Sequence, residues 1–217
     1  MRRSKFFVTK GKPNIALTQV SVRKTGCISI TAIMGTLAII LSLYRVEIPF
    51  PILVFLKIDF AEIPSFITYY LLGFNWGLLC SVIHWIMLLA RSGDPVGPTM
   101  KFLAVSSNLL GMCFVKKITG RVTKIYLILE LVSGAMVRIA VMTIVNMVVL
   151  EVLFPSYLNF SKMLLENAGI KVATDYDALA SILIIVGFFN LVHSIVSTLP
   201  ALAIVSAIKK RLTSLFK

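Results

Sequence analysis

The sequence predicts an all-α membrane protein with six transmembrane helices and both termini in the cytoplasm. Two observations carry this prediction: 58% of the 217 residues are hydrophobic, and 14% are charged. Soluble domains are about 45–50% apolar and about 25% charged, so this composition cannot surround a soluble core with a polar surface. It excludes a disordered chain, a secreted disulfide scaffold and an ordinary soluble enzyme.

Six apolar runs mark the expected helices. The run 26–44 carries no charge, and its 19 residues span about 28 Å as a helix, close to the thickness of one bilayer core. The run 61–72 is too short to cross alone. We expect it either to borrow residues from the preceding stretch or to form a half-buried helix shielded by its neighbours. The other four runs are 75–90, 98–115, 125–154 and 178–208.

The distribution of charge predicts the orientation of these helices. The tail up to residue 24, the loop 116–124 and the tail 209–217 would lie on one side of a six-span bundle. Together they hold 15 of the 22 Lys and Arg residues and no Asp or Glu, whereas the loops of the opposite side hold six cations and seven acids. This positive-inside pattern predicts a multi-pass protein of the plasma membrane with cytoplasmic termini. We expect the basic tails to meet anionic lipid rather than nucleic acid.

We therefore divide the chain into three parts: a basic cytoplasmic tail at 1–25, a transmembrane substrate-binding domain at 26–208 and a second basic tail at 209–217. Enzyme chemistry is not expected. The three cysteines lack metal-ligand spacing, there are two histidines, and no phosphate-binding loop or hydrolase motif occurs. We predict no metal site and no resident cofactor. Few acids fall within the runs, which disfavours a proton-coupled carrier.

A few polar residues at depth are the candidates for solute binding. Asn146 lies in the fifth run, Asn190 and His193 lie one turn apart in the sixth, and Lys101 and Asn108 lie in the fourth. A polar group that faces lipid costs several kcal/mol, so these side chains should point inward. Each one alone could equally serve to hold helices together through hydrogen bonds. As a group, Asn146, Asn190 and His193 favour a solute pocket with aromatic and aliphatic surroundings.

The segment between the first two runs is apolar but contains Pro49 and Pro51, which prevent a helix. We expect residues 45–58 to fold over the bundle as an external lid, with Leu56, Lys57 and Asp59 among its functional residues. A plain structural turn is the alternative for the stretch that follows Lys57.

The first run carries small residues at helical spacing, in the pairs Thr31/Gly35 and Ala32/Thr36. Such pairs let another helix approach closely. The neighbour could be another helix of this chain or a separate subunit, and the spacing does not distinguish them.

Four segments resemble the substrate-binding S components of energy-coupling-factor (ECF) vitamin transporters, most closely the riboflavin-specific type. The first is L-K-I-D-F-A-E-I-P at 56–64. The second is G-P-T-M-K-F-L-A at 97–104, similar to a G-E-x-x-N-F-L segment. The others are Asn146 with the following L-F-P at 153–155, and F-N-L-V-H at 189–193, similar to F-N-L-I-K. The chain departs from the riboflavin-specific pattern at three positions, with His193 in place of Lys, Lys101 in place of Asn and Pro98 in place of Glu.

The resemblance implies a substrate-binding subunit of an ATP-driven importer. It implies riboflavin as a transported ligand held by Asn146, Asn190 and His193, with the lid closing over it. It also implies a transmembrane T subunit, docked on the small residues of the first helix, and two cytoplasmic ATPases. An S component for another vitamin, a self-sufficient secondary transporter and a membrane assembly protein without a solute remain alternatives.

Overall fold

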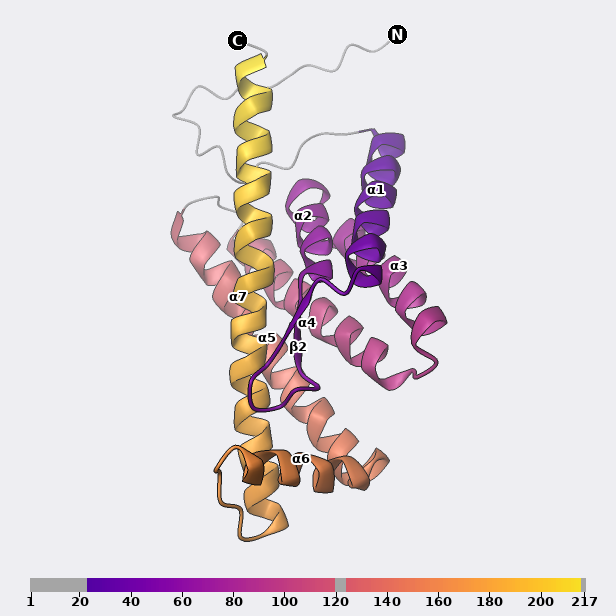
Figure 1. Cartoon of the computed structure of the whole chain (residues 1–217). Helices are drawn as coiled ribbons and strands as arrows, with labels where there is room; N and C mark the ends of the chain where they lie inside the picture. Colours follow the sequence, from indigo (N-terminus) through magenta and orange to yellow (C-terminus); the bar gives the residue numbers. More distant parts are fainter. Residues whose placement is uncertain (1–22, 120–123, 216–217) are drawn as a thin grey trace.

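The computed structural model describes residues 23–119 and 124–215, and most of them are helical (Figure 1). The elements, in chain order, are α1 (Lys24–Leu43), β1 (Glu47–Pro49), β2 (Lys57–Asp59), η1 (Phe60–Glu62), α2 (Ile63–Leu72), α3 (Phe74–Ser92), α4 (Val96–Thr119), α5 (Lys124–Val148), η2 (Val149–Leu153), α6 (Pro155–Asn167) and α7 (Asp175–Leu215). η1 is a 3-10 turn and η2 is a π-helical turn that continues α5. The predicted N-terminal tail falls largely outside the described residues.

Five helices of the described chain are long and apolar enough to cross a membrane: α1, α3, α4, α5 with η2, and α7. The ten-residue α2 is not among them, and its residues 64–71 are all buried. Of the two alternatives for this run, the structure therefore has the short helix enclosed by its neighbours. The start of α1 and the end of α7 lie at the same end of the bundle (Figure 1). The side of the membrane on which that end lies stays a prediction.

Local signals explain where α2 begins and ends. The Asp59 carboxylate accepts a hydrogen bond from the backbone N–H of Ala61 at 2.8 Å, which caps η1. Pro64 follows in the first turn of α2, where its missing N–H costs nothing. Gly73 ends the helix with φ of 102°, a conformation that favours glycine. The turn before α2 thereby directs the Glu62 side chain into the bundle, where it is buried.

The helices cross closely where glycines face a neighbour. A Cβ atom on Gly111 of α4 would lie 2.5 Å from the carbonyl oxygen of Ser133 in α5, so no larger residue fits there. Ser133 donates its hydroxyl hydrogen to the Gly111 carbonyl at 3.0 Å. Beside this crossing, Phe66 and Tyr69 of α2 and Leu109 of α4 belong to one buried cluster. The helices are packed tightly around this crossing.

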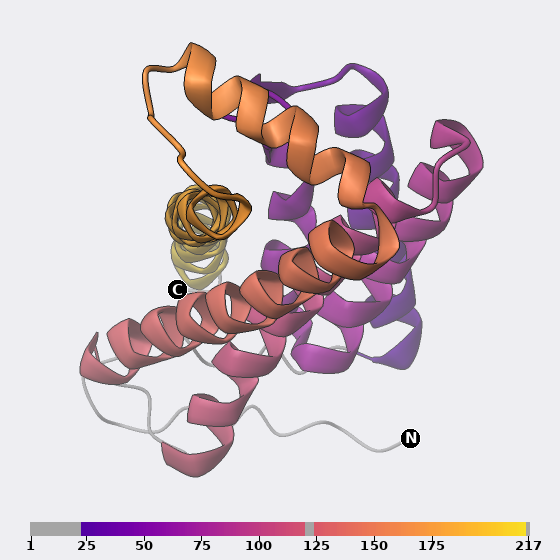
Figure 2. The ribbon, with the colours of Figure 1, turned by 90° about the horizontal axis from the view of Figure 1, so that it is seen from below.

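The hairpin of β1 and β2 lies over the bundle at the end that also carries α6 (Figures 1 and 2). We call this the hairpin end. The strands pair antiparallel, with Glu47 opposite Asp59. At the loop, Leu53 is fully buried in a cluster with Leu150, Leu165 and Ile182. The ring of Phe50 packs edge-on against Phe189 of α7 at 5.6 Å.

The helix α6 was not expected from the sequence, which placed a loop between the fifth and sixth helices. Figure 2 shows α6 crossing the hairpin end, joined through η2 to α5 and through a loop to α7. Pro155 at its start and Gly169, with φ of 83°, shortly after its end are the local signals for its boundaries. Its low apolar content hid it from a search for membrane spans.

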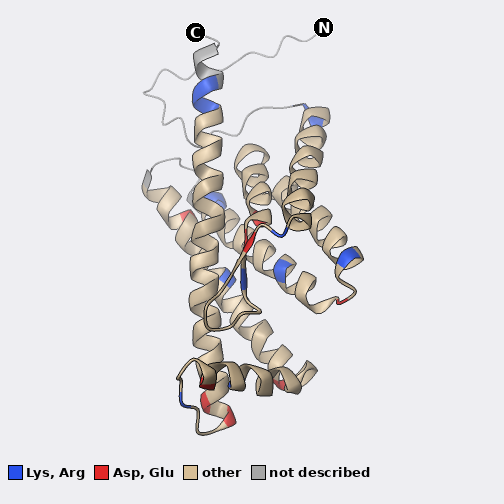
Figure 3. Cartoon of the chain, in the orientation of Figure 1, with Lys and Arg blue, Asp and Glu red and all other residues tan. Residues whose placement is uncertain are grey.

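Charged residues are distributed unevenly along the bundle (Figure 3). Acidic residues gather at the hairpin end, where Asp175 and Asp177 occupy the first turn of α7. Lys209, Lys210 and Arg211 lie near the opposite end of α7. Which of these two ends faces the cytoplasm stays a prediction.

Candidate substrate-binding site

A cavity of about 370 Å³ lies beneath the hairpin, among α4, α5, α6 and α7. Pockets for small molecules hold about 300–1,000 Å³, so this one has room for a single compact solute. Apolar side chains form most of the lining. They come from the hairpin and four helices, and they include Phe55 and Leu56 of the hairpin, Met100 and Ala104 of α4, Met142 of α5, Tyr157 and Phe160 of α6, and Phe189 of α7.

A buried ion pair also lines this cavity. The guanidinium of Arg138 in α5 donates from Nη1 to Glu62 Oε2 at 2.7 Å and from Nη2 to Glu62 Oε1 at 3.2 Å. Both side chains are about 1% exposed. Two parallel hydrogen bonds fix the geometry of an arginine–carboxylate pair more firmly than charge alone. Removing either partner would leave an uncompensated charge in the interior, which is strongly destabilising.

Arg138 also orients the two polar residues of α7. Its Nε donates to Asn190 Oδ1 at 3.0 Å, and its Nη2 lies 3.0 Å from His193 Nδ1. A guanidinium has donors and no acceptor, so Nδ1 must accept this bond and the ring hydrogen of a neutral His193 lies on Nε2. Nε2 lies 3.1 Å from the backbone nitrogen of Asp59 and 3.2 Å from its carbonyl oxygen. The end of the hairpin is thus tied to α7 and α5.

Four of the five residues predicted to bind solute line the cavity: Lys101, Asn146, Asn190 and His193. The Asn146 amide nitrogen donates to the Met142 carbonyl at 2.7 Å, and its Oδ1 has no partner among the described residues. Asn108 lies elsewhere, which corrects the prediction for it. It is fully buried, donates to Ser194 Oγ at 2.8 Å and joins α4 to α7 as a structural hydrogen bond.

Of the predicted lid residues, Leu56 and Lys57 line the cavity, whereas Pro49 and Pro51 lie in the hairpin away from it. Asp59 is buried and accepts from Lys101 Nζ at 2.6 Å. Lys57 pairs with Glu47 on the opposite strand.

The small residues of α1 fall on two faces. Thr31 and Gly35 are buried, and a Cβ on Gly35 would lie 3.0 Å from Ile83 of α3. Ala32 and Thr36 are exposed. The first pair therefore packs within the chain and is not available to a partner, which corrects the prediction for Thr31 and Gly35. The second pair remains open to a partner.

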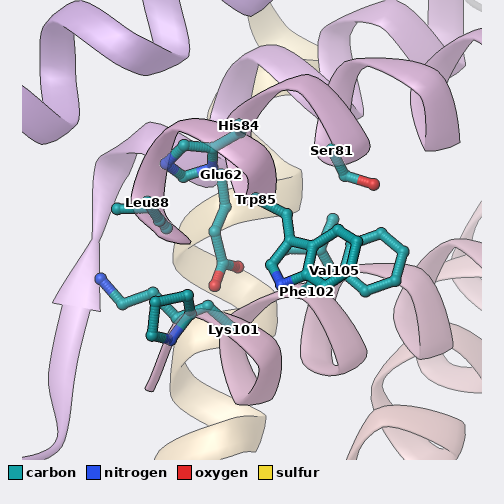
Figure 4. Close-up of a pocket in the computed structure, with 9 residues that line it drawn as sticks. Glu62, Ser81, His84, Trp85, Leu88, Lys101, Phe102 and Val105 are labelled. Carbon is teal, nitrogen blue, oxygen red and sulfur yellow. The ribbon is translucent and has the colours of Figure 1, made fainter. Parts of the chain in front are cut away.

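A second, much smaller chamber of about 10 Å³ lies between α3 and α4 (Figure 4). Glu62, His84 and Lys101 line it, and Trp85 stacks on Phe102 at its side with ring centroids 5.0 Å apart. Its volume suits one water molecule. Glu62 and Lys101 line both this chamber and the large cavity, so the polar end of the cavity continues toward α3.

Sequence reasoning missed Glu62 as part of the site and did not pair it with Arg138. The available signal was Arg138, a cation near the middle of the run 125–154, because a buried Arg requires a carboxylate partner. The contribution of Tyr157 and Phe160 was missed together with α6.

Comparison with known proteins decides the family. Residues 28–205 match the family described as the substrate-specific component of the ECF transporter. The chain belongs to this family. It is thus a substrate-binding component of a membrane transporter and not an enzyme, and it is a multi-pass membrane protein, with spans that the apolar helices account for.

Two similar proteins can be named. The riboflavin transporter RibU of Staphylococcus aureus (strain TCH60) is 30% identical over 131 residues, which cover 60% of this chain and 68% of RibU. A solved S component of a bacterial ECF transporter superposes with a TM-score of 0.62 at 24% identity, covering 90% of this chain and 99% of the other. The second likeness establishes the fold.

Proposed function

We propose that this S component binds riboflavin in the large cavity and delivers it to an ATP-driven ECF complex. The observation that carries the proposal is the lining of the cavity. Most of its walls are apolar and aromatic, and fixed polar side chains gather at one end. Riboflavin has the same division, because its flat ring system is mostly apolar and carries a polar edge of carbonyl and N–H groups. The name of the relative RibU supports this choice of vitamin.

The polar end offers matching donors and acceptors. Asn146 Oδ1 can accept from a ring N–H, and the second amide hydrogen of Asn190 can donate to a ring carbonyl. The Arg138 contacts with Asn190 and His193 hold both side chains in place before the solute arrives. Pre-positioned groups lower the entropy lost on binding, which favours high affinity. His193 takes the place of the Lys that riboflavin-specific members usually carry, and Arg138 keeps a cation at this end.

The hairpin closes the cavity on one side. Leu53 anchors it in the apolar cluster at the hairpin end, and Phe50 packs against Phe189 of α7. Leu56 and Lys57 line the cavity. We propose that this segment, residues 45–58, must move for the solute to enter or leave.

Energy for import would come from partners. We propose a transmembrane T subunit and two cytoplasmic ATPases, as in the family, with the exposed small residues Ala32 and Thr36 of α1 as the contact with the T subunit.

Thermal stability of the purified full chain tests the choice of vitamin. We expect riboflavin to raise the unfolding temperature of the protein in detergent, and the protein to retain flavin absorbance after purification from cells. Asn146→Ala should abolish most of the stabilisation, whereas Asn159→Ala, on the exposed side of α6, should keep it. A colourless protein that riboflavin does not stabilise would contradict riboflavin as the solute. Stabilisation by a different vitamin would then identify the substrate.

A further inference from the structure

We propose that Asp59 makes this cavity selective for uncharged solutes, by neutralising Lys101 at its edge. The proposal rests on the function proposed above and adds the residue that sets charge selectivity. A solute that carries a phosphate or carboxylate group is rejected, because the cations of the cavity already bind carboxylates of the protein.

Three cationic side chains line the cavity within the described chain, and each has a carboxylate partner. Arg138 holds Glu62 at 2.7 Å, Lys101 holds Asp59 at 2.6 Å, and Lys57 pairs with Glu47. Glu47 is also 3.8 Å from Lys101, so it lies between the two lysines. An anionic solute would have to displace one of these carboxylates in order to gain a cation.

The N-terminus of α4 is a further feature at the cavity that could hold an anion, because its free N–H groups carry partial positive charge. A carboxylate of the protein occupies it too. Asp94 accepts from the backbone N–H of Val96 at 3.0 Å and of Gly97 at 3.4 Å, and all three residues line the cavity. His193 adds no charge, since Arg138 donates to its Nδ1 and thereby selects the neutral ring.

Among these three cations, Lys101 is the one that an anionic solute would reach most readily once the carboxylate partner, Asp59, is removed. Its side chain is 31% exposed, whereas Arg138 is 1% exposed and locked by two hydrogen bonds to Glu62. Lys57 is more exposed but has Glu47 on its own hairpin. Lys101 also stands where riboflavin-specific relatives usually carry Asn, so its charge and the need to neutralise it are features of this chain.

The two oxygens of Asp59 have separate tasks, and this allows a clean substitution. Oδ1 accepts from the Ala61 N–H and caps η1, whereas Oδ2 binds Lys101. Asp59→Asn keeps an oxygen for the cap and removes the charge that faces Lys101. Glu47 could replace Asp59 only in part, because it already binds Lys57.

The experiment compares dissociation constants for riboflavin and for riboflavin 5′-phosphate, which differ by one phosphate group. We expect the wild type to bind riboflavin far more tightly. In Asp59→Asn, the ratio of the phosphate's dissociation constant to that of riboflavin should fall by about tenfold or more, because the phosphate gains a hydrogen bond to the freed cation and tenfold corresponds to about 1.4 kcal/mol. The double variant Asp59→Asn/Lys101→Met should lose this gain.

Asp175→Asn is the matched control. Asp175 pairs with Lys162 at 3.0 Å outside the cavity, so its substitution removes the same charge at the hairpin end without freeing a cavity cation. An unchanged ratio in Asp59→Asn, with riboflavin still bound, would overturn the charge selection and leave the proposed function standing. A gain of equal size in Asp175→Asn, or one that persists in the double variant, would also overturn it. Failure of the wild type to bind either flavin would instead overturn both proposals.

Discussion

Two buried carboxylates show how differently two parts of the bundle are built: the half that holds the cavity, and the tightly packed half around the crossing of α4 and α5. Glu62 lies at the cavity and shares a bidentate ion pair with Arg138. Glu130 lies in the tightly packed half, where it accepts a hydrogen bond from the Tyr69 hydroxyl at 2.5 Å and Lys116 sits 5.3 Å from the centre of the Tyr69 ring. The first half keeps paired charges beside a cavity, and the second joins helices through a neutral donor and close packing. The proposed binding site therefore lies where the interior is polar and open.

The largest effect should follow from breaking the ion pair of the cavity half. Arg138→Met would leave Glu62 buried without its partner and release Asn190 and His193. We expect a loss of about 3–5 kcal/mol in the free energy of unfolding, together with loss of solute binding. Thermal unfolding in detergent measures the first and ligand-induced stabilisation measures the second. The double variant Arg138→Met/Glu62→Gln should recover part of the stability, because no unpaired charge remains; no recovery would mean that the pair does not act as a unit.

An intermediate effect should come from crowding the packed half. Gly111→Val would place side-chain atoms against the Ser133 carbonyl, and overpacking of this kind costs about 1–3 kcal/mol. The measured free energy of unfolding should fall, while the affinity for the solute at low temperature should fall by less than in Arg138→Met. Equal losses of affinity in both variants would contradict the separation of packing from binding. Gly187→Val controls for the change of residue, because a Cβ there would meet only ordinary contact with Ile139 at 3.8 Å and Gly187 does not line the cavity.

The smallest effect should come from Glu130→Gln. The glutamine keeps an oxygen that accepts from the Tyr69 hydroxyl, so we expect a change of about 1 kcal/mol or less in stability. Glu62→Gln leaves Arg138 without a charged partner, so it should lower the free energy of unfolding several times more than Glu130→Gln does. A larger loss at Glu130 than at Glu62 would reverse the comparison between the two halves.

The sequence predicts the helices better than it predicts the site. Each apolar run lies near a helix of the structure, because hydropathy is a local property. The contact between Arg138 and Glu62 joins residues 76 positions apart, so no local pattern reports it. Asn108 and Asn190 are both inward-facing amides, yet Asn190 lines the cavity whereas Asn108 donates to Ser194. That difference depends on how the helices are rotated against one another, which follows from packing contacts such as the glycine crossing of α4 and α5.

The most direct test is to titrate riboflavin into the purified full chain and to monitor the quenching of riboflavin fluorescence. It tests whether the cavity lined by Arg138 and Glu62 is the binding site. We expect saturable quenching by the wild type and by Asn159→Ala. In Asn146→Ala the dissociation constant should rise by about tenfold or more, since one hydrogen bond to the solute is worth about 0.5–1.5 kcal/mol and a buried partner left unpaired costs more. Equal affinity in the wild type and Asn146→Ala would contradict this binding site.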